Sequence, residues 1–145
     1  MVYVSRKEHF NAAHKLYNDN WTKQKNEEIF GKCANEYFHG HNFEIIVTVK
    51  GTPHPDTGFV VDMKKLGDIM TDKIINAVDH KNINLQVSFM QGKICSCENM
   101  VVEFWKILEP EVNSISNGRL YSIKLYETHK NYVEYFGPHN TPYEV

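Results

Sequence analysis

Alternating apolar and polar residues mark the strands of this chain, because a strand with one buried face repeats every two residues. The first such stretch runs from Val2 to His14 and the second from about His39 to Lys50. A short apolar run, Phe59 to Val61, follows a dense group of turn residues and is expected to return beside the second strand in a hairpin. Two later stretches, Tyr121 to Tyr126 and Asn131 to Phe136, predict a last pair of strands.

Apolar residues spaced three and four apart predict two helices between these strands. The first runs from Asp62 to Ala77, and the second from Ser96 to Pro110, where the proline is expected to end it. Asp62 and Ser96 carry short oxygen-bearing side chains that suit the N-cap position of a helix. Each helix has an apolar stripe and is therefore expected to pack on the sheet.

Two remaining segments, Tyr17 to Phe30 and Lys81 to Lys93, have no clear period and are expected to be loops, the first with one helical turn. No repeat or internal linker divides the chain, so residues 1–145 are expected to form a single domain. Helices grouped between antiparallel strands predict an α+β domain, in which an antiparallel four-stranded sheet carries both helices on one face. Such a sheet has two edges, so assembly edge to edge with other copies is expected.

Composition narrows the classes of function. Lysine and arginine total 16 and aspartate and glutamate 18, a net charge of -2 without a basic patch, so no nucleic acid partner is expected. No apolar run approaches the roughly 20 residues of a membrane span, and the N-terminus lacks the apolar core of a signal peptide. The cysteines are odd in number, and Cys95 and Cys97 are too close for an easy mutual bridge. Reduced thiols and a cytoplasmic location are therefore expected.

Three histidines fall on apolar strand faces, where polar rings are rare unless something coordinates them. His39 and His41 share the face of Phe43, and His14 ends the first strand on its apolar face. Together they form an all-nitrogen ligand set, for which Zn²⁺ is the best candidate in a cytosolic protein. Three protein ligands leave a fourth position open for catalysis, whereas a fourth protein ligand would make the site structural, and spacing alone does not decide between the two.

Cys33 lies in the polar segment from Gly31 to Glu36 and has two interpretations. It is either the fourth metal ligand of a closed site, or a nucleophile or base activated by a nearby dication or histidine. Its polar surroundings favour the reactive role.

Asp79 and His80 place a carboxylate beside an imidazole at a helix end. The histidine either complements the helix dipole or, if it faces Cys33, shares protons with the thiol.

Glu127 continues the apolar face of Leu125, where an unpaired charge is costly. Either the strand has ended and the carboxylate is solvated, or a partner holds it on that face. The pattern leaves both interpretations open.

Five motifs follow one another along nearly the whole chain, from about Phe10 to Gly137. They are Phe10-Asn-Ala-Ala-His14-Lys-Leu, Gly31-Lys-Cys33 with His39-Gly-His41-Asn, Asp79-His80-Lys-Asn, Ser96-Cys97-Glu98-Asn99 and Tyr126-Glu127-Thr. In sequence and in order they resemble the 6-pyruvoyl tetrahydropterin synthase family.

The resemblance implies the metal ligands and the base. In the family, the histidines matching His14, His39 and His41 bind zinc, and the cysteine matching Cys33 is the proton-transferring base. The implied fold is the tunnelling fold, in which trimers join their sheets into a barrel and stack in pairs as hexamers, with sites between subunits. That homo-oligomer agrees with the two open edges of the predicted sheet.

The resemblance also implies how the substrate is held. The pair matching Asp79 and His80 tunes the protonation of the cysteine. The glutamate matching Glu127, a catalytic as well as a substrate-binding residue, anchors the pterin ring, and the segment matching Cys97 and Glu98 lines the pterin pocket. The implied enzyme is a zinc-dependent carbon–oxygen lyase of tetrahydrobiopterin biosynthesis. It eliminates triphosphate from 7,8-dihydroneopterin triphosphate to give 6-pyruvoyl tetrahydropterin, without a redox cofactor.

Two alternatives stand beside this reading. A sister subgroup, 6-carboxytetrahydropterin synthase of queuosine and other deazapurine biosynthesis, shares the zinc triad and the cysteine. Its better-known bacterial members have fewer residues between the cysteine and His-Gly-His, whereas this chain has the five residues Ala34 to Phe38, followed after the triplet by Asn42, as in the pyruvoyl type. Cys97 departs from the threonine common at its position, which leaves the substrate preference open. The second alternative is a non-enzymatic zinc-binding module with Cys33 as fourth ligand.

Overall fold

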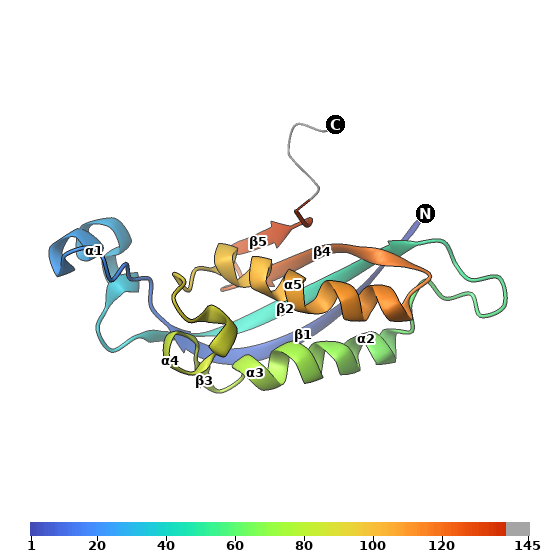
Figure 1. Cartoon of the computed structure of the whole chain (residues 1–145), viewed down its shortest axis with the longest axis horizontal. Coiled ribbons are helices and arrows are strands. Elements are labelled where there is room, and N and C mark those ends of the chain that lie inside the picture. The colour runs from blue at the N-terminus through green and yellow to red at the C-terminus, as the bar shows by residue number, and fades with distance from the viewer. Residues whose placement is uncertain (139–145) are drawn as a thin grey trace.

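Two long antiparallel strands form the centre of the sheet in the computed structural model, which describes residues 1–138 (Figure 1). β1 (Val2–His14) pairs with β2 (His39–Gly51) along their whole length. β4 (Gly118–Tyr126) pairs with the other side of β2, and β5 (Tyr132–Tyr135) pairs with β4, all antiparallel. The strands predicted at these four places are confirmed.

One edge of the sheet differs from the prediction of four antiparallel strands. β3 (Lys81–Asn82), in a segment predicted to be a loop, runs parallel to the end of β1, so the sheet has five strands in the order β3-β1-β2-β4-β5. The N–H of His80 donates to the Asn11 carbonyl at 2.6 Å and brings the two segments together. Two residues are too few to show a period-two pattern. The same segment continues into α4 (Ile83–Gln86) and a 3₁₀ turn (Ser88–Met90).

The helices cover one face of the sheet, as predicted (Figure 1). α2 (Met63–Met70) continues through a π-helical turn (Thr71–Ile75) into α3 (Asn76–Val78), and α5 (Cys97–Ile115) lies beside it. The core between the two layers is built on fully buried aromatic and aliphatic side chains, including Phe10, Phe43, Phe104, Ile45, Leu66 and Met100. None of the helices within residues 1–138 is long and apolar enough to cross a membrane.

Both predicted N-caps are present. The carboxylate of Asp62 accepts hydrogen bonds from the N–H groups of Lys64 and Lys65 at 2.9 and 3.2 Å. The hydroxyl of Ser96 accepts one from the N–H of Asn99 at 3.2 Å. These bonds satisfy N–H groups that have no partner inside the helix, and they fix where α2 and α5 begin.

The end of α5 was predicted wrongly, because the helix runs past Pro110 to Ile115. A proline inside a helix costs about 3 kcal/mol, since it removes a hydrogen bond and crowds the preceding turn. Beyond the proline, Val112 is fully buried, and the side chain of Asn113 accepts a hydrogen bond from the N–H of Leu120 in β4 at 2.7 Å. Burying a valine contributes about 2 kcal/mol, so packing offsets much of the local cost.

The predicted hairpin return from Phe59 to Val61 is also wrong. Val60 and Val61 are buried, but within residues 1–138 their main chain pairs with the segment that follows α5 and not with β2. Val61 forms an isolated bridge with Ser116, and the N–H of Asn117 donates to the Val60 carbonyl at 2.7 Å. An apolar triplet shows that the segment is buried, but it does not identify the partner.

The long connection after β1 contains more helix than the single turn predicted. α1 (Lys23–Phe30) has eight residues and is capped by the Thr22 side chain. Asn26 is fully buried in it and is satisfied by the preceding loop. Its side chain accepts the N–H of Asn18 at 2.7 Å and donates to the Asn18 and Thr22 carbonyls at 3.0 Å each. The connection therefore has a defined structure, and it leads directly into the turn that contains Cys33.

Candidate metal centre and adjoining pocket

Three histidine side chains meet at one end of the central strand pair. His14 ends β1 opposite His39 in β2, and His41 lies two residues further along β2. The ring centroids are 4.7 Å apart for His14 and His39, 5.3 Å for His14 and His41, and 4.9 Å for His39 and His41. One ligand nitrogen from each ring lies within 4.8 Å of the others. The structure thus brings together the three residues that the sequence pattern singled out.

Each of these rings has one buried nitrogen without a hydrogen-bond partner in residues 1–138: His14 Nε2, His39 Nδ1 and His41 Nε2. An unsatisfied buried polar atom costs about 1–3 kcal/mol, so three of them in one place indicate a ligand that supplies the missing contacts. Neutral imidazole nitrogens are the commonest metal ligands in proteins. The donor set therefore fits a single metal ion.

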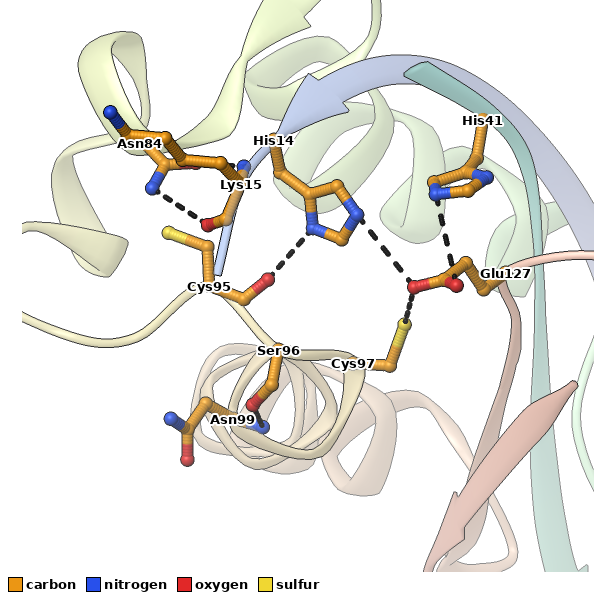
Figure 2. Close-up of polar contacts among 9 residues, drawn as sticks. All are labelled: His14, Lys15, His41, Asn84, Cys95, Ser96, Cys97, Asn99 and Glu127. Carbon is orange, nitrogen blue, oxygen red and sulfur yellow. Dashed lines mark hydrogen bonds and ion pairs between the residues drawn. The ribbon is translucent and has the colours of Figure 1, made fainter. Parts of the chain in front are cut away.

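The main chain fixes the tautomer of His14. Its Nδ1 lies 2.8 Å from the Cys95 carbonyl oxygen, which can only accept, so Nδ1 carries the proton and Nε2 the lone pair (Figure 2). Burial lowers the pKa of His14 despite this bond, and the neighbouring His39 and His41 lower it further. Burial is also the main cause of the lowered pKa of His39. Neutral rings are the form that metal binding requires.

Glu127 reaches this centre from the end of β4 (Figure 2). Its Oε2 lies 3.7 Å from His14 Nε2, and its Oε1 lies 3.7 Å from His41 Nε2. Oε2 also accepts a hydrogen bond from the Cys97 thiol at 3.3 Å. The side chain is 27% exposed. The strand has ended at Tyr126, as one interpretation of the sequence had it, but the carboxylate is partly buried and bonded to Cys97 instead of being solvated.

Cys33 lies beside the metal cluster and not in it. It occupies a 3₁₀ turn (Gly31–Ala34) and is partly exposed. It lines a pocket of about 380 Å³ together with Cys97, Glu98 and Glu127. In the described part of the chain, the cluster able to hold a metal consists of the three histidines without Cys33. Cys33 therefore lies at a pocket that it shares with Glu127, which in turn lies beside the histidine cluster.

Asp79 and His80 lie away from that pocket. They follow α3 at the outer edge of the sheet, where His80 has a left-handed backbone (φ 57°). The His80 ring is 78% exposed, and its Nδ1 lies 3.0 Å from Asp79 Oδ2. His80 lines a separate surface pocket with His41 and Lys81. A single chain thus places His80, to which Asp79 is bonded, and Cys33 in different pockets.

Asp79 also gives the fold a pH-dependent contact. Its Oδ1 accepts the N–H of Asn11 at 2.9 Å, and this bond, assisted by His80, lowers the pKa of the carboxyl below its ordinary value of 3.8. Because the folded-state pKa is the lower one, the stabilisation is complete above pH 3.8 and disappears as the pH falls through the folded-state pKa.

We expect Asp79→Asn to lower the free energy of unfolding at neutral pH. In acid, we expect the free energies of unfolding of the variant and of the parent protein to become equal. Urea unfolding at several pH values measures this, and a difference that stays constant with pH would contradict it.

Sequence reasoning missed two parts of the centre. The first is the Cys95 carbonyl, which orients His14 across 81 positions of the chain. A main-chain oxygen carries no signal in residue type, so no pattern could have found it. The second is the bond between Cys97 and Glu127, each of which was predicted to be a pocket residue, without a prediction that they touch.

The fold and the site together indicate the class of protein to which this chain belongs. An α+β domain with a three-histidine cluster able to hold a metal, beside a pocket lined by a cysteine and a glutamate, has a layout that fits an enzyme. The chain belongs to the 6-pyruvoyl tetrahydropterin synthase family, whose family model matches residues 3–138. The family inferred from the sequence motifs is thereby confirmed.

Individual relatives agree with this assignment. The 6-pyruvoyl tetrahydrobiopterin synthase of Homo sapiens is 37% identical over 134 residues, which cover 92% of this chain and 90% of the human protein. The protein of the same name from Dictyostelium discoideum is 34% identical over 136 residues, covering 94% and 96%. Among solved structures, Caenorhabditis elegans 6-pyruvoyl tetrahydropterin synthase superposes with a TM-score of 0.82 at 32% identity, covering 94% of this chain and 95% of that one.

Proposed function

We propose that this chain is a zinc-dependent 6-pyruvoyl tetrahydropterin synthase, a lyase that converts 7,8-dihydroneopterin triphosphate to 6-pyruvoyl tetrahydropterin and triphosphate. The observation that carries the proposal is the trio of unpartnered histidine nitrogens beside the pocket of Cys33 and Glu127. Relatives that match nearly the whole chain bear the name of this activity. The product places the enzyme in tetrahydrobiopterin biosynthesis.

His14, His39 and His41 are the residues that would hold the zinc ion. When bound, the ion would supply a Lewis acid that increases the acidity of substrate hydroxyls beside it. The lowered pKa values of His14 and His39 support this role, because they keep both rings neutral and ready to bind metal at neutral pH.

Cys33 would be the base that moves protons on the substrate. Its thiol lines the pocket without being a member of the metal cluster, so it is free to take a proton from the side chain and return one to the ring. The pterin ring gains the two hydrogens that the side chain loses as it becomes a pyruvoyl group. The reaction therefore needs no external reductant or oxidant.

Glu127, with Cys97 and Glu98 beside it, would hold the pterin ring. An ionised carboxylate suits the paired N–H groups on the edge of such a ring, because it can accept two parallel hydrogen bonds. The pocket that these residues line with Cys33 places the ring anchor and the base on the same cavity.

We infer that the enzyme is a cytoplasmic homo-oligomer, a trimer or a hexamer of two trimers, with the sheets joined in the barrel of the tunnelling fold. Two features of the chain support this. In residues 1–138, β3 and the Asp79–His80 pair cover only the last part of the outer edge of β1, which leaves the edge before Asn11 without a strand partner and available to a neighbouring copy. In addition, the Asp79–His80 pair lies away from Cys33 in its own chain, as expected if it serves the thiol of another copy.

Incubation of the zinc-loaded protein with 7,8-dihydroneopterin triphosphate, followed by mass spectrometry of the pterin product, tests the proposed function. We expect 6-pyruvoyl tetrahydropterin and free triphosphate. Recovery of 6-carboxytetrahydropterin with acetaldehyde would overturn the proposal in favour of the sister activity. Unchanged substrate, with one zinc ion bound per chain, would instead favour a non-enzymatic zinc-binding module.

A further inference from the structure

The Glu127 carboxylate lacks donors among the histidines that surround it. The N–H at His14 Nδ1 donates a hydrogen bond to the Cys95 carbonyl, so the His14 Nε2 that faces Glu127 presents a lone pair. Nε2 of His41 has no hydrogen-bond partner and is also 3.7 Å from the carboxylate. Both separations exceed the 2.7–3.2 Å range of an N–H···O bond, so neither ring fixes the carboxylate.

The Cys97 thiol supplies the missing donor. Its sulfur is 3.3 Å from Glu127 Oε2, and within residues 1–138 it is the one side chain hydrogen-bonded to that carboxylate (Figure 2). Cys97 is the first residue of α5, directly after the N-cap Ser96, and is 7% exposed. Burial, and next the charge of Glu127, raises the pKa of the thiol, which keeps the S–H proton available for donation. The helix start therefore fixes the position of the donor.

Glu127 has two directions in which to turn. It lines the pocket of Cys33, and it also lines a second pocket with His9, His41 and His129 on the neighbouring surface. A carboxylate with no donor on the first side would be free to rotate toward the second, where histidine rings are available. A hydrogen bond to a charged group is worth about 1.5–3 kcal/mol, enough to decide between two such orientations.

We propose that Cys97 is a positioning residue, whose thiol donates to Glu127 Oε2 and thereby holds the carboxylate in the orientation in which its two oxygens receive the paired N–H groups of the substrate ring. The identity of the ring rests on the proposed function. The bond between thiol and carboxylate belongs to the protein alone and can be tested without any ligand.

Two substitutions of nearly equal size separate hydrogen bonding from simple space filling. Cys97→Ser keeps a donor in place of the thiol, and Cys97→Ala removes it. The dissociation constant of biopterin is measured from the quenching of its fluorescence. We expect this constant to rise about tenfold in Cys97→Ala and to stay within about threefold of the parent value in Cys97→Ser. Equal zinc content and equal thermal midpoints in the two variants are the controls for folding. Equal affinity of Cys97→Ala and the parent protein would overturn the proposal.

Infrared spectroscopy of the zinc-loaded protein gives a second test that needs no pterin. A thiol that donates to a carboxylate has a lowered S–H stretching frequency, and the band of Cys97 is assigned by its loss in Cys97→Ser. In Glu127→Gln, whose neutral amide accepts more weakly, we expect that band to move to higher frequency. An unshifted band would overturn the proposal. If the band shifts while the parent protein fails to bind biopterin, the proposed function fails and the positioning of Glu127 by Cys97 stands.

Discussion

Replacing Cys33 by alanine is expected to lower the turnover of 7,8-dihydroneopterin triphosphate by about 10²- to 10⁴-fold, the usual contribution of a general acid–base group. The variant is expected to keep one zinc ion per chain, because the thiol lines the pocket without belonging to the histidine cluster. Steady-state assays and elemental analysis of the same preparation measure the two quantities.

The other interpretation of Cys33 makes the opposite prediction. If the thiol were the fourth ligand of a closed site, Cys33→Ala would lose metal together with activity. Cys95→Ala is the matched control, since the Cys95 side chain is buried beside the Lys93 carbonyl and its main-chain carbonyl still orients His14. We expect that control to keep both zinc and turnover.

Removal of the metal is expected to destabilise the protein and abolish its activity. Without the ion, three buried nitrogens would stay without partners among residues 1–138. An ion that binds only the folded state adds about 4 kcal/mol to the free energy of unfolding when its concentration is a thousand times its dissociation constant. Chelation should lower the thermal midpoint, and added zinc should restore both the midpoint and the turnover.

His41→Ala tests whether this response comes from the histidine cluster. We expect the variant to be inactive and its thermal midpoint to be insensitive to zinc. His54→Ala is the control, because that histidine is exposed in the turn after β2 and should leave the zinc response intact. A zinc response in His41→Ala equal to that of the parent protein would mean that the metal binds elsewhere.

Much of the fold was predictable because its strands are half-buried and its helices begin at strong caps. The alternation along β1 and β2 locates the central pair, and Asp62 and Ser96 mark the helix starts. Two of the failures share a cause, which is pairing between distant segments. Lys81–Asn82 and Val60–Val61 acquire their conformations from partners that lie far away in the sequence.

The residues of the candidate site also differ in how far the sequence could predict them. His14, His39 and His41 could be foreseen from the sequence, because strand alternation places polar rings on an apolar face. Cys33 and the Asp79–His80 pair were joined only by family resemblance, since adjacency in sequence gives no geometry, and a single chain keeps them apart. The oligomeric arrangement that would unite them stays a prediction.

The hydrogen bond between His14 and Cys95 joins the sheet to the start of the longest helix through a single imidazole ring. Nδ1 of that ring binds the segment that leads into Cys97, and Nε2 is the nitrogen offered to the metal. The arrangement of the metal cluster and the position of Cys97 in its pocket are therefore not independent, since both depend on one ring orientation. A substitution that turned this one ring would therefore disturb the metal cluster and the start of α5 together.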